Sequence, residues 1–215
     1  GLYELYGLDQ AKVRIGLEYG VLPNLMVGFG RSSFDKVYDS YIKYVILHQK
    51  RGAKNTPFSI VGFSNISINS ERKGYSNYPL TGRISFAHQL LIGSKLNSAL
   101  SIQIMPSWIH WNMVQLIEDP NDIFVLGFGM RYLITKSTSF NLEYLYRFNE
   151  SEYNRDFYYN SFSIGFDIET GGHVFQLHLT NSMPMTESAF LTRTYGDWFN
   201  GGVHFGFNIS REFNL

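Results

Sequence analysis

Ser163, Asp167 and His178 are the residue types of a hydrolase triad, and they lie on two predicted strands joined by Gly171-Gly172. A two-residue turn at these glycines makes Ser163 and Asp167 diagonal neighbours of His178 on one face of the sheet. Diagonal side chains start about 7 Å apart, which is too far for direct hydrogen bonds. A sheet also offers no evident oxyanion hole for a serine nucleophile. We therefore expect a hydrogen-bonded network here and keep the three residues only as weak catalytic candidates.

His88 and His110 form a second pair, because strand parity places both on the apolar face of neighbouring predicted strands, opposite or diagonal to each other. A neutral imidazole still needs hydrogen-bond partners, so an apolar face is an unusual place for it. Three interpretations stay open: a contact site for another protein, a position near the membrane interface, and a register shifted by one residue. Two histidines alone are too few for a typical zinc site, and we predict no metal.

These residues lie on segments that alternate apolar and polar residues with a period of two. Turn signals separate eleven such segments, at 11–20, 25–33, 40–49, 58–69, 83–96, 99–111, 124–134, 139–148, 203–213 and the two halves of 161–182. The inward face of 58–69 is ambiguous. No segment has the period of a long amphipathic helix, and no internal repeat or linker is evident. The pattern predicts an all-β, antiparallel up-and-down barrel as a single domain over residues 1–215.

The connections between the segments alternate in length. Short turns fall at 21–24, 51–57, near 97–98, near 136–137 and at 171–172, and longer connections fall at 34–39, 71–82, 113–122, 150–159 and 183–201. One end of the barrel, the turn rim, thus carries short turns, and the other, the loop rim, carries most of the longer loops. This asymmetry is typical of outer-membrane barrels.

The composition of the two faces distinguishes a soluble barrel from a membrane barrel. The apolar face carries aliphatic residues and Phe in mid-strand, and aromatic residues toward the strand ends, among them Tyr19, Trp108, Tyr132, Tyr146 and Phe213. Aromatic girdles at two membrane interfaces have this pattern. Strands of about 9–11 residues also suit a tilted crossing of the bilayer. A soluble barrel with an apolar interior would need a large apolar ligand or a central helix, and no such helix is evident. We predict that the apolar face contacts lipid.

The polar face then lines the lumen. Its predicted members are Lys12, Arg14, Glu18, Arg83, Gln89, Gln103, Arg131, Glu143, Arg147, Asp167, Glu169, Gln176, His178, His204 and Glu212. Both charge signs occur on strands that should be neighbours, so ion pairs can satisfy the charges inside the barrel. A tight turn near Ser137 places Arg131 opposite or diagonal to Glu143.

The number of segments is odd, whereas single-chain bacterial barrels normally have an even number of strands with both ends at the turn rim. Counting back from the last segment puts the start of the first one at the loop rim. We therefore expect a further strand before residue 1, giving twelve in the full-length protein, preceded by a signal peptide that is removed.

The segment 183–201 is the longest connection and is rich in large apolar residues. This content exceeds what a solvated loop needs, so we expect it to fold into the mouth of the barrel, to dock a partner, or to pack over the rim. Trp198 and Phe199 within it, together with His88 and His110, are the candidate interface residues.

Composition excludes several functional classes. Lys plus Arg and Asp plus Glu both number 18, so the chain has no basic excess to bind nucleic acid. The sequence contains no cysteine, which excludes disulfides and thiolate chemistry. It also lacks a run of 18 apolar residues, which excludes a membrane-spanning helix. We predict no cofactor and no nucleic-acid partner.

Several stretches together resemble a known family: GLDQAKVRIGLEYG, VGFGRSSFDKVYDSYIKY, FAHQLLIGSKL, NSFSIGFDIETGGHVFQLHLTNS and HFGFNISREF. The family comprises outer-membrane β-barrels of Bacteroidota known only as a domain of unknown function, and the resemblance covers nearly the whole chain. It implies the barrel fold, an outer-membrane location and a longer N-terminus with a signal peptide and a further strand. It supplies no catalytic residues. Some members are encoded near c-type cytochromes, which hints at a partner protein in the envelope.

Three functions are compatible with this sequence. The first expectation is an integral outer-membrane barrel without catalytic activity, surrounded by lipid, that serves as a scaffold or a subunit of an envelope complex. The alternatives are a narrow, porin-like pore for small solutes and an outer-membrane hydrolase that uses Ser163, His178 and Asp167. A continuous water-filled lumen would favour the pore, whereas paired charges and an inserted 183–201 segment would favour the scaffold. A hydrogen-bonded Ser–His–Asp geometry beside a cleft would favour the enzyme. The sequence indicates neither a solute nor an oligomeric state.

Overall fold

The computed structural model describes residues 11–52, 55–71, 79–114, 117–148 and 157–213. In this part of the chain, eleven antiparallel strands form one sheet whose spatial order is the sequence order. The strands are β1 (Arg14–Leu22), β2 (Leu25–Ser32), β3 (Val37–Leu47), β4 (Ser59–Asn69), β5 (Ile84–Lys95), β6 (Leu100–Trp111), β7 (Asp122–Leu133), β8 (Thr138–Arg147), β9 (Ser161–Thr170), β10 (His173–Thr180) and β11 (His204–Arg211). The all-β up-and-down prediction is confirmed.

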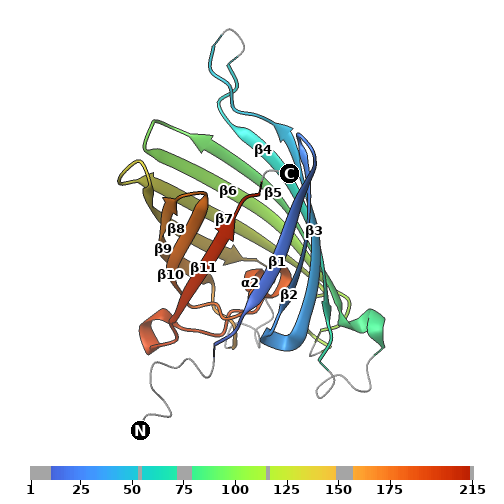
Figure 1. Ribbon diagram of the computed structural model, residues 1–215. Coiled ribbons are helices and arrows are strands. Elements are labelled where there is room, and N and C mark those ends of the chain that lie inside the picture. The colour runs from blue at the N-terminus through green and yellow to red at the C-terminus, as the bar shows by residue number, and fades with distance from the viewer. Residues whose placement is uncertain (1–10, 53–54, 72–78, 115–116, 149–156, 214–215) are drawn as a thin grey trace.

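The sheet curls into a barrel with most of its short turns at one end, the top in Figure 1, and most of its longer connections at the other. Two connections depart from this division, because 48–58 at the top is long and 33–36 at the bottom is short. The helical turns follow this division. The short helix α2 (Glu187–Thr192) and the 3-10 turns η2 (Phe34–Lys36), η3 (Leu80–Arg83) and η4 (Trp198–Asn200) all lie in loop-rim connections. Within the described ranges, no helix is long and apolar enough to span a membrane.

The predicted strand ends differ from the observed ones by up to three residues, and two of these differences concern residues of the inner face. The third strand begins at Val37 rather than at residue 40, because the β3–β4 ladder continues to the pair Val37–Asn69 beside the η2 turn. Arg83 was assigned to a strand, but it ends η3, and β5 begins one residue later.

Burial follows strand parity, and the apolar residues largely point outward. In β9, Phe166 and Ile168 are 45% and 39% exposed on the outer face. In β3, Asp39 and Tyr41 are buried on the inner face, whereas Ile42 is exposed outside. The face of β4 that was ambiguous in the sequence is also resolved, since Phe63 is buried inside and packs on Tyr41 with ring centroids 5.3 Å apart.

The β9–β10 hairpin has the predicted register, with Asp167 opposite Gln176 and Gly165 opposite His178. Gly171 and Gly172 have φ values of 56° and 81°, the left-handed conformations of a two-residue type I′ turn. Glycine adopts both conformations without strain, and their handedness matches the twist of the strands.

The apolar core lies inside the barrel near the loop rim. It consists of inward-facing residues of β5 to β8 and one residue of α2: Ala87, Met105, Ile109, Val125, Leu145 and Leu191. The inner face therefore combines a polar surface with an apolar patch that receives a helix.

Candidate functional site

The connection between β10 and β11 makes an excursion into the barrel and returns to its starting point. The Gly196 N–H donates to the Asn181 carbonyl at 3.2 Å, and Asn181 Nδ2 donates to the Gly196 carbonyl at 2.9 Å. Residues 182–195, which we call the lumen loop, lie between these two anchors. They include α2, which contacts β4 to β8 from inside (Figure 1). A compact excursion with adjoining ends is an Ω-loop.

An apolar contact holds the lumen loop against the wall. Leu191 is 2% exposed and packs into the core cluster of β5 to β8. Gly127 makes room for this cluster, because a Cβ at this position would lie 2.8 Å from both Leu145 Cδ2 and Met105 Cε. Complete burial of a leucine side chain contributes about 1.5–3 kcal/mol.

Polar contacts fix the same loop. The guanidinium of Arg147 on β8 donates to the carbonyls of Thr192 and Tyr158, each at 2.6 Å. Trp111 Nε1 donates to Thr192 Oγ1 at 3.2 Å, and the hydroxyls of Ser85 and Ser188 lie 2.7 Å apart. The loop is thus bound by hydrogen bonds from three strands of the wall as well as by burial.

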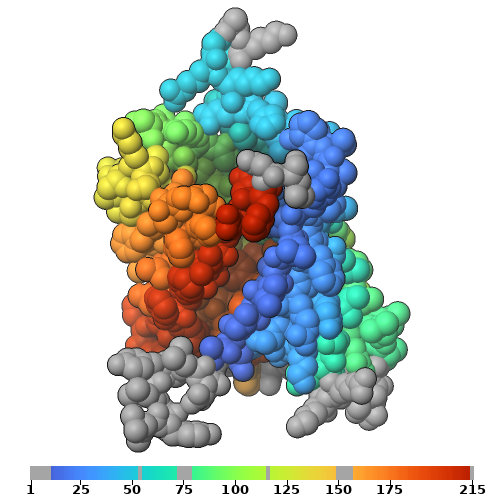
Figure 2. Space-filling model, viewed as in Figure 1, coloured from blue at the N-terminus to red at the C-terminus, as the bar shows by residue number. Residues whose placement is uncertain are grey.

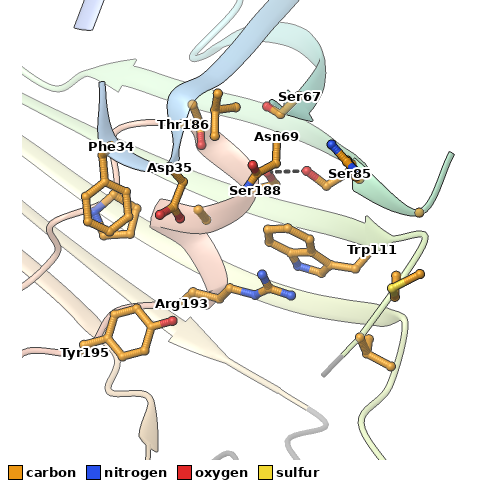
Figure 3. Close-up of a pocket in the computed structure, with 17 residues that line it drawn as sticks. Phe34, Asp35, Ser67, Asn69, Ser85, Trp111, Thr186, Ser188, Arg193 and Tyr195 are labelled. Carbon is orange, nitrogen blue, oxygen red and sulfur yellow. Dashed lines mark hydrogen bonds between the residues drawn. The ribbon is translucent and has the colours of Figure 1, made fainter. Parts of the chain in front are cut away.

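A pocket of about 120 Å³ lies at the loop rim between the lumen loop, η2, the end of β4 and the start of β5 (Figure 3). The Arg193 guanidinium carbon lies 3.5 Å from the ring centroid of Trp111, a cation–π contact. Asp35 also lines the pocket, and burial, with a smaller effect of Glu71, raises the pKa of this carboxyl. The pocket is small, since ligand sites usually have about 300 Å³ or more.

The lumen wall of β1 to β3 carries paired charges. Arg14 Nε donates to Asp39 Oδ1 at 3.1 Å, and Asp39 is 1% exposed. Glu18 accepts a hydrogen bond from the Tyr41 hydroxyl and lies 3.6 Å from Lys43 Nζ. Sequence reasoning missed Asp39 because the third strand was started after it. Parity with Tyr41, two residues later, would have placed it on the inner face.

Arg131 lies diagonal to Glu143 as predicted, because it is opposite Asn141 while Gly129 is opposite Glu143. Its guanidinium instead donates to Ser139 Oγ at 3.0 Å and to Glu169 at 2.7 Å. The long side chain thus extends across β8 to a carboxylate on β9, two strands away.

The remaining predicted lumen residues differ in their position along the wall and in their hydrogen-bond partners. Gln89 donates to Ser107, and Gln176 both donates to Asp167 and accepts from Asn208. Gln103 is paired with Gly129, and His204 with the buried Thr180. The others lie at the ends of the wall: Arg83 lines the loop-rim pocket, Lys12 precedes β1 and Glu212 follows β11.

The structure does not bring Ser163, His178 and Asp167 into a hydrogen-bonded triad. Ser163 donates to Thr180 Oγ1 at 2.8 Å, and Asp167 accepts from Gln176 at 3.0 Å. His178 lies over a glycine of β11, where a Cβ at Gly206 would be 2.0 Å from its Nε2. Among the described residues, no hydrogen bond joins His178 to Ser163 or Asp167.

His88 and His110 lie on the outer wall, diagonal to each other, since His88 is opposite Trp108 and His110 is opposite Phe86 within the ladder. Each finds a partner: His88 Nδ1 lies 2.8 Å from Ser64 Oγ, and His110 Nδ1 lies 2.8 Å from Asp122. The His88 ring also stacks on Trp108, with centroids 5.2 Å apart. In the described part of the chain, no three His, Asp or Glu residues form a group that could hold a metal ion.

Trp198 and Phe199 are on η4, which follows the lumen loop. Trp198 packs on Phe162 with ring centroids 5.1 Å apart and donates to its carbonyl at 3.0 Å. Phe199 is 97% exposed. One connection therefore places α2 inside the barrel and a pair of large aromatic residues at the outer rim.

Comparisons with known proteins give one family and one fold. A family model described as a membrane-bound beta-barrel domain (DUF5777) matches residues 1–213. The KdgM porin in complex with disordered oligogalacturonate is 12% identical, with a TM-score of 0.56 over 79% of this chain and 83% of that chain. The KdgM porin alone is 11% identical, with a TM-score of 0.52 over the same shares of the two chains. At this identity the likeness concerns the fold. No curated protein sequence matches the chain.

Proposed function

Because the chain belongs to the family of membrane-bound beta-barrel domains, we propose that it is a non-catalytic barrel of the bacterial outer membrane, a scaffold or subunit of an envelope complex. The lumen loop carries this proposal. An open pore needs a continuous aqueous path, whereas here α2 occupies the loop-rim end of the interior and buries Leu191 in the wall.

The charges along the inner face also support a structural role. The pairs Arg14–Asp39 and Arg131–Glu169 link neighbouring or nearby strands across the lumen surface. Charges that are satisfied by each other offer less to a passing solute and cross-link the wall.

Location and partners are part of the proposal. The apolar outer face, with its aromatic strand ends, suits an outer membrane, and the motif resemblance suggests a Bacteroidota envelope. The exposed Phe199 beside Trp198 is the surface that we assign to a membrane or envelope-protein contact.

A narrow pore for small solutes is the second candidate. It is favoured by the polar inner surface away from α2 and by the porin fold of the two structural neighbours. No observation in the described residues favours the hydrolase, since Ser163 and Asp167 are hydrogen-bonded to other side chains.

Conductance in planar bilayers distinguishes the two candidates. The full-length natural protein is compared with a variant that lacks residues 182–195 and joins Asn181 directly to Gly196, whose backbones are already hydrogen-bonded. We expect the natural protein to be silent and the variant to conduct, because only the variant has an unobstructed loop-rim end. Current from the variant shows that the barrel inserts into the bilayer. A reproducible current from the natural protein would support the pore and overturn the scaffold.

A further inference from the structure

The loop-rim pocket contains two opposite charges that do not pair with each other. Asp35 from η2 and Arg193, directly after α2, both line it (Figure 3). Within the described ranges no ion pair joins the two side chains. A carboxylate and a guanidinium that line one cavity without meeting leave room for a ligand between them.

The guanidinium of Arg193 is held by stacking rather than by hydrogen bonds. Its central carbon lies 3.5 Å from the ring centroid of Trp111, and its side chain makes no hydrogen bond or ion pair in the part of the chain that the structure describes. Stacking uses the face of the guanidinium, so the N–H groups along its edge stay available to a carboxylate. Arg83 lines the same pocket and adds positive charge. This side of the pocket is therefore suited to an anionic group.

The side of the pocket near η2 is acidic. Burial raises the pKa of Asp35, and the nearby Glu71 raises it further, whereas Arg193 and Lys12 act in the opposite direction. The carboxyl of Asp35 accepts no hydrogen bond from any other described residue. An ammonium group at this position would stabilise the ionised carboxylate against both burial and the charge of Glu71.

The backbone of η2 is unusual at the same place. Asp35 and Lys36 have φ values of 51° and 49°, a left-handed conformation that residues other than glycine seldom adopt twice in succession. Strained conformations of this kind are concentrated at sites that hold ligands. The strain at η2 thus coincides with the acidic side of the pocket.

The size and the access of the pocket limit the ligand to a small molecule. One water molecule occupies about 30 Å³ of liquid volume, and a pocket of about 120 Å³ therefore has room for a molecule the size of a small amino acid. Asp35 and Tyr195 are both exposed, so the ligand can enter from the loop rim. Figure 2 shows this rim at the bottom, where the blue surface of β2 and η2 lies beside the green surface of η3.

We propose that the loop-rim pocket binds a small zwitterion, a free α-amino acid, with its carboxylate on Arg193 and its ammonium group on Asp35. Phe34 and Tyr195 also line the pocket and supply apolar surface for a short side chain. The ligand would contact both η2 and the lumen loop, and its binding does not depend on whether the lumen conducts.

Alanine and its two halves test this proposal. Propionate is alanine without the ammonium group, and ethylamine is alanine without the carboxylate. The full-length natural protein in detergent micelles is titrated with each compound, and saturation-transfer NMR gives the dissociation constants. We expect alanine to bind at least about tenfold more tightly than either half, because each half leaves one charge of the pocket without its partner.

Two variants assign the two charges. Asp35→Asn removes the carboxylate, and asparagine tolerates the left-handed conformation of this position. Arg193→Gln removes the guanidinium and keeps a polar side chain. Each should weaken alanine binding by about tenfold or more. Arg211→Gln is the matched control, since this arginine stacks on Phe213 at the end of β11 and does not line the pocket. Heat-modifiable gel mobility shows which variants fold.

The alternatives give different results. Propionate that binds as tightly as alanine would overturn the proposal in favour of a simple anion site, and ethylamine that does so would overturn it in favour of a cation site. Alanine binding that is absent from the natural protein, or equal in folded Asp35→Asn and Arg211→Gln variants, would also overturn it.

Discussion

Arg147 is a buried cation whose two terminal nitrogens each hold a different loop-rim connection. It donates to Thr192 in the lumen loop and to Tyr158 in the connection between β8 and β9, and it is 5% exposed. Charge-assisted bonds to backbone carbonyls are roughly twice as strong as neutral ones. A single side chain of the wall therefore couples the position of α2 to that of a second connection.

Arg147→Met should loosen the lumen loop, because it leaves two carbonyls without their donor while keeping a long apolar side chain. Each buried carbonyl that loses its partner costs about 1–3 kcal/mol. Because about 1.4 kcal/mol corresponds to a tenfold population change, trypsin cleavage after Arg193 in the folded protein should accelerate by about tenfold or more.

Arg131→Met is the matched control for this experiment. Arg131 also faces the lumen, but its partners are Ser139 and Glu169 rather than the loop. Cleavage after Arg193 should stay at the rate of the natural protein. Equal rates in both variants would show that Arg147 does not hold the loop.

At the scale of elements, the β9–β10 hairpin depends on its turn. Gly172, with φ of 81°, has a backbone conformation that a β-branched residue adopts only with strain. Gly172→Val should lower the free energy of unfolding by about 1–2 kcal/mol. The midpoint of urea unfolding in phospholipid vesicles measures this change.

Gly171→Asn is the control for the hairpin. Asparagine tolerates the left-handed region, and φ at Gly171 is 56°, so the midpoint should move little. If both variants unfold at the same urea concentration, the turn does not limit the stability of the hairpin.

The strands could be predicted from the sequence, and α2 could not. The alternation around Gly171-Gly172 fixes both the pairing of Asp167 with Gln176 and the outward direction of Phe166. A six-residue helix, in contrast, is too short to show a period of 3.6 and has little stability alone. Its position depends on wall residues far away in sequence, and only the apolar content of 183–201 indicated that it packs somewhere.

Partner choice along the lumen shows a second limit. Strand parity correctly placed Arg131 on the inner face and diagonal to Glu143, but its carboxylate partner is Glu169. A register predicted from the sequence gives distances between Cβ atoms. The long, flexible side chain of an arginine, however, can reach acceptors beyond the adjacent strand. The face and the register of a residue are therefore predictable from the sequence, whereas its ion-pair partner depends on the curvature of the folded sheet.

At the scale of the whole molecule, the two faces of the sheet meet different solvents. Phe128 on β7 is 41% exposed on the outer face, and Gln103 of the adjacent β6 lies on the inner face beside Gly129. Phe128→Arg should destabilise the folded protein in phospholipid vesicles by about 2–4 kcal/mol, the cost of an arginine near the bilayer midplane.

Gln103→Arg is the control at the same height of the barrel. An inward arginine remains among polar groups, so urea unfolding should shift by much less than for Phe128→Arg. The reverse order would mean that the polar face, and not the apolar one, contacts the lipid.

Because the two ends of the lumen loop lie next to each other, this loop can vary independently of the strands. Because the chain leaves the wall at Asn181 and rejoins it at Gly196, the strands need not change when the intervening residues do. The strands thus form a constant wall, and the residues of the lumen loop inside it can be replaced independently of that wall. Replacement of residues 182–195 can therefore change the interior of the barrel while its outer surface stays the same.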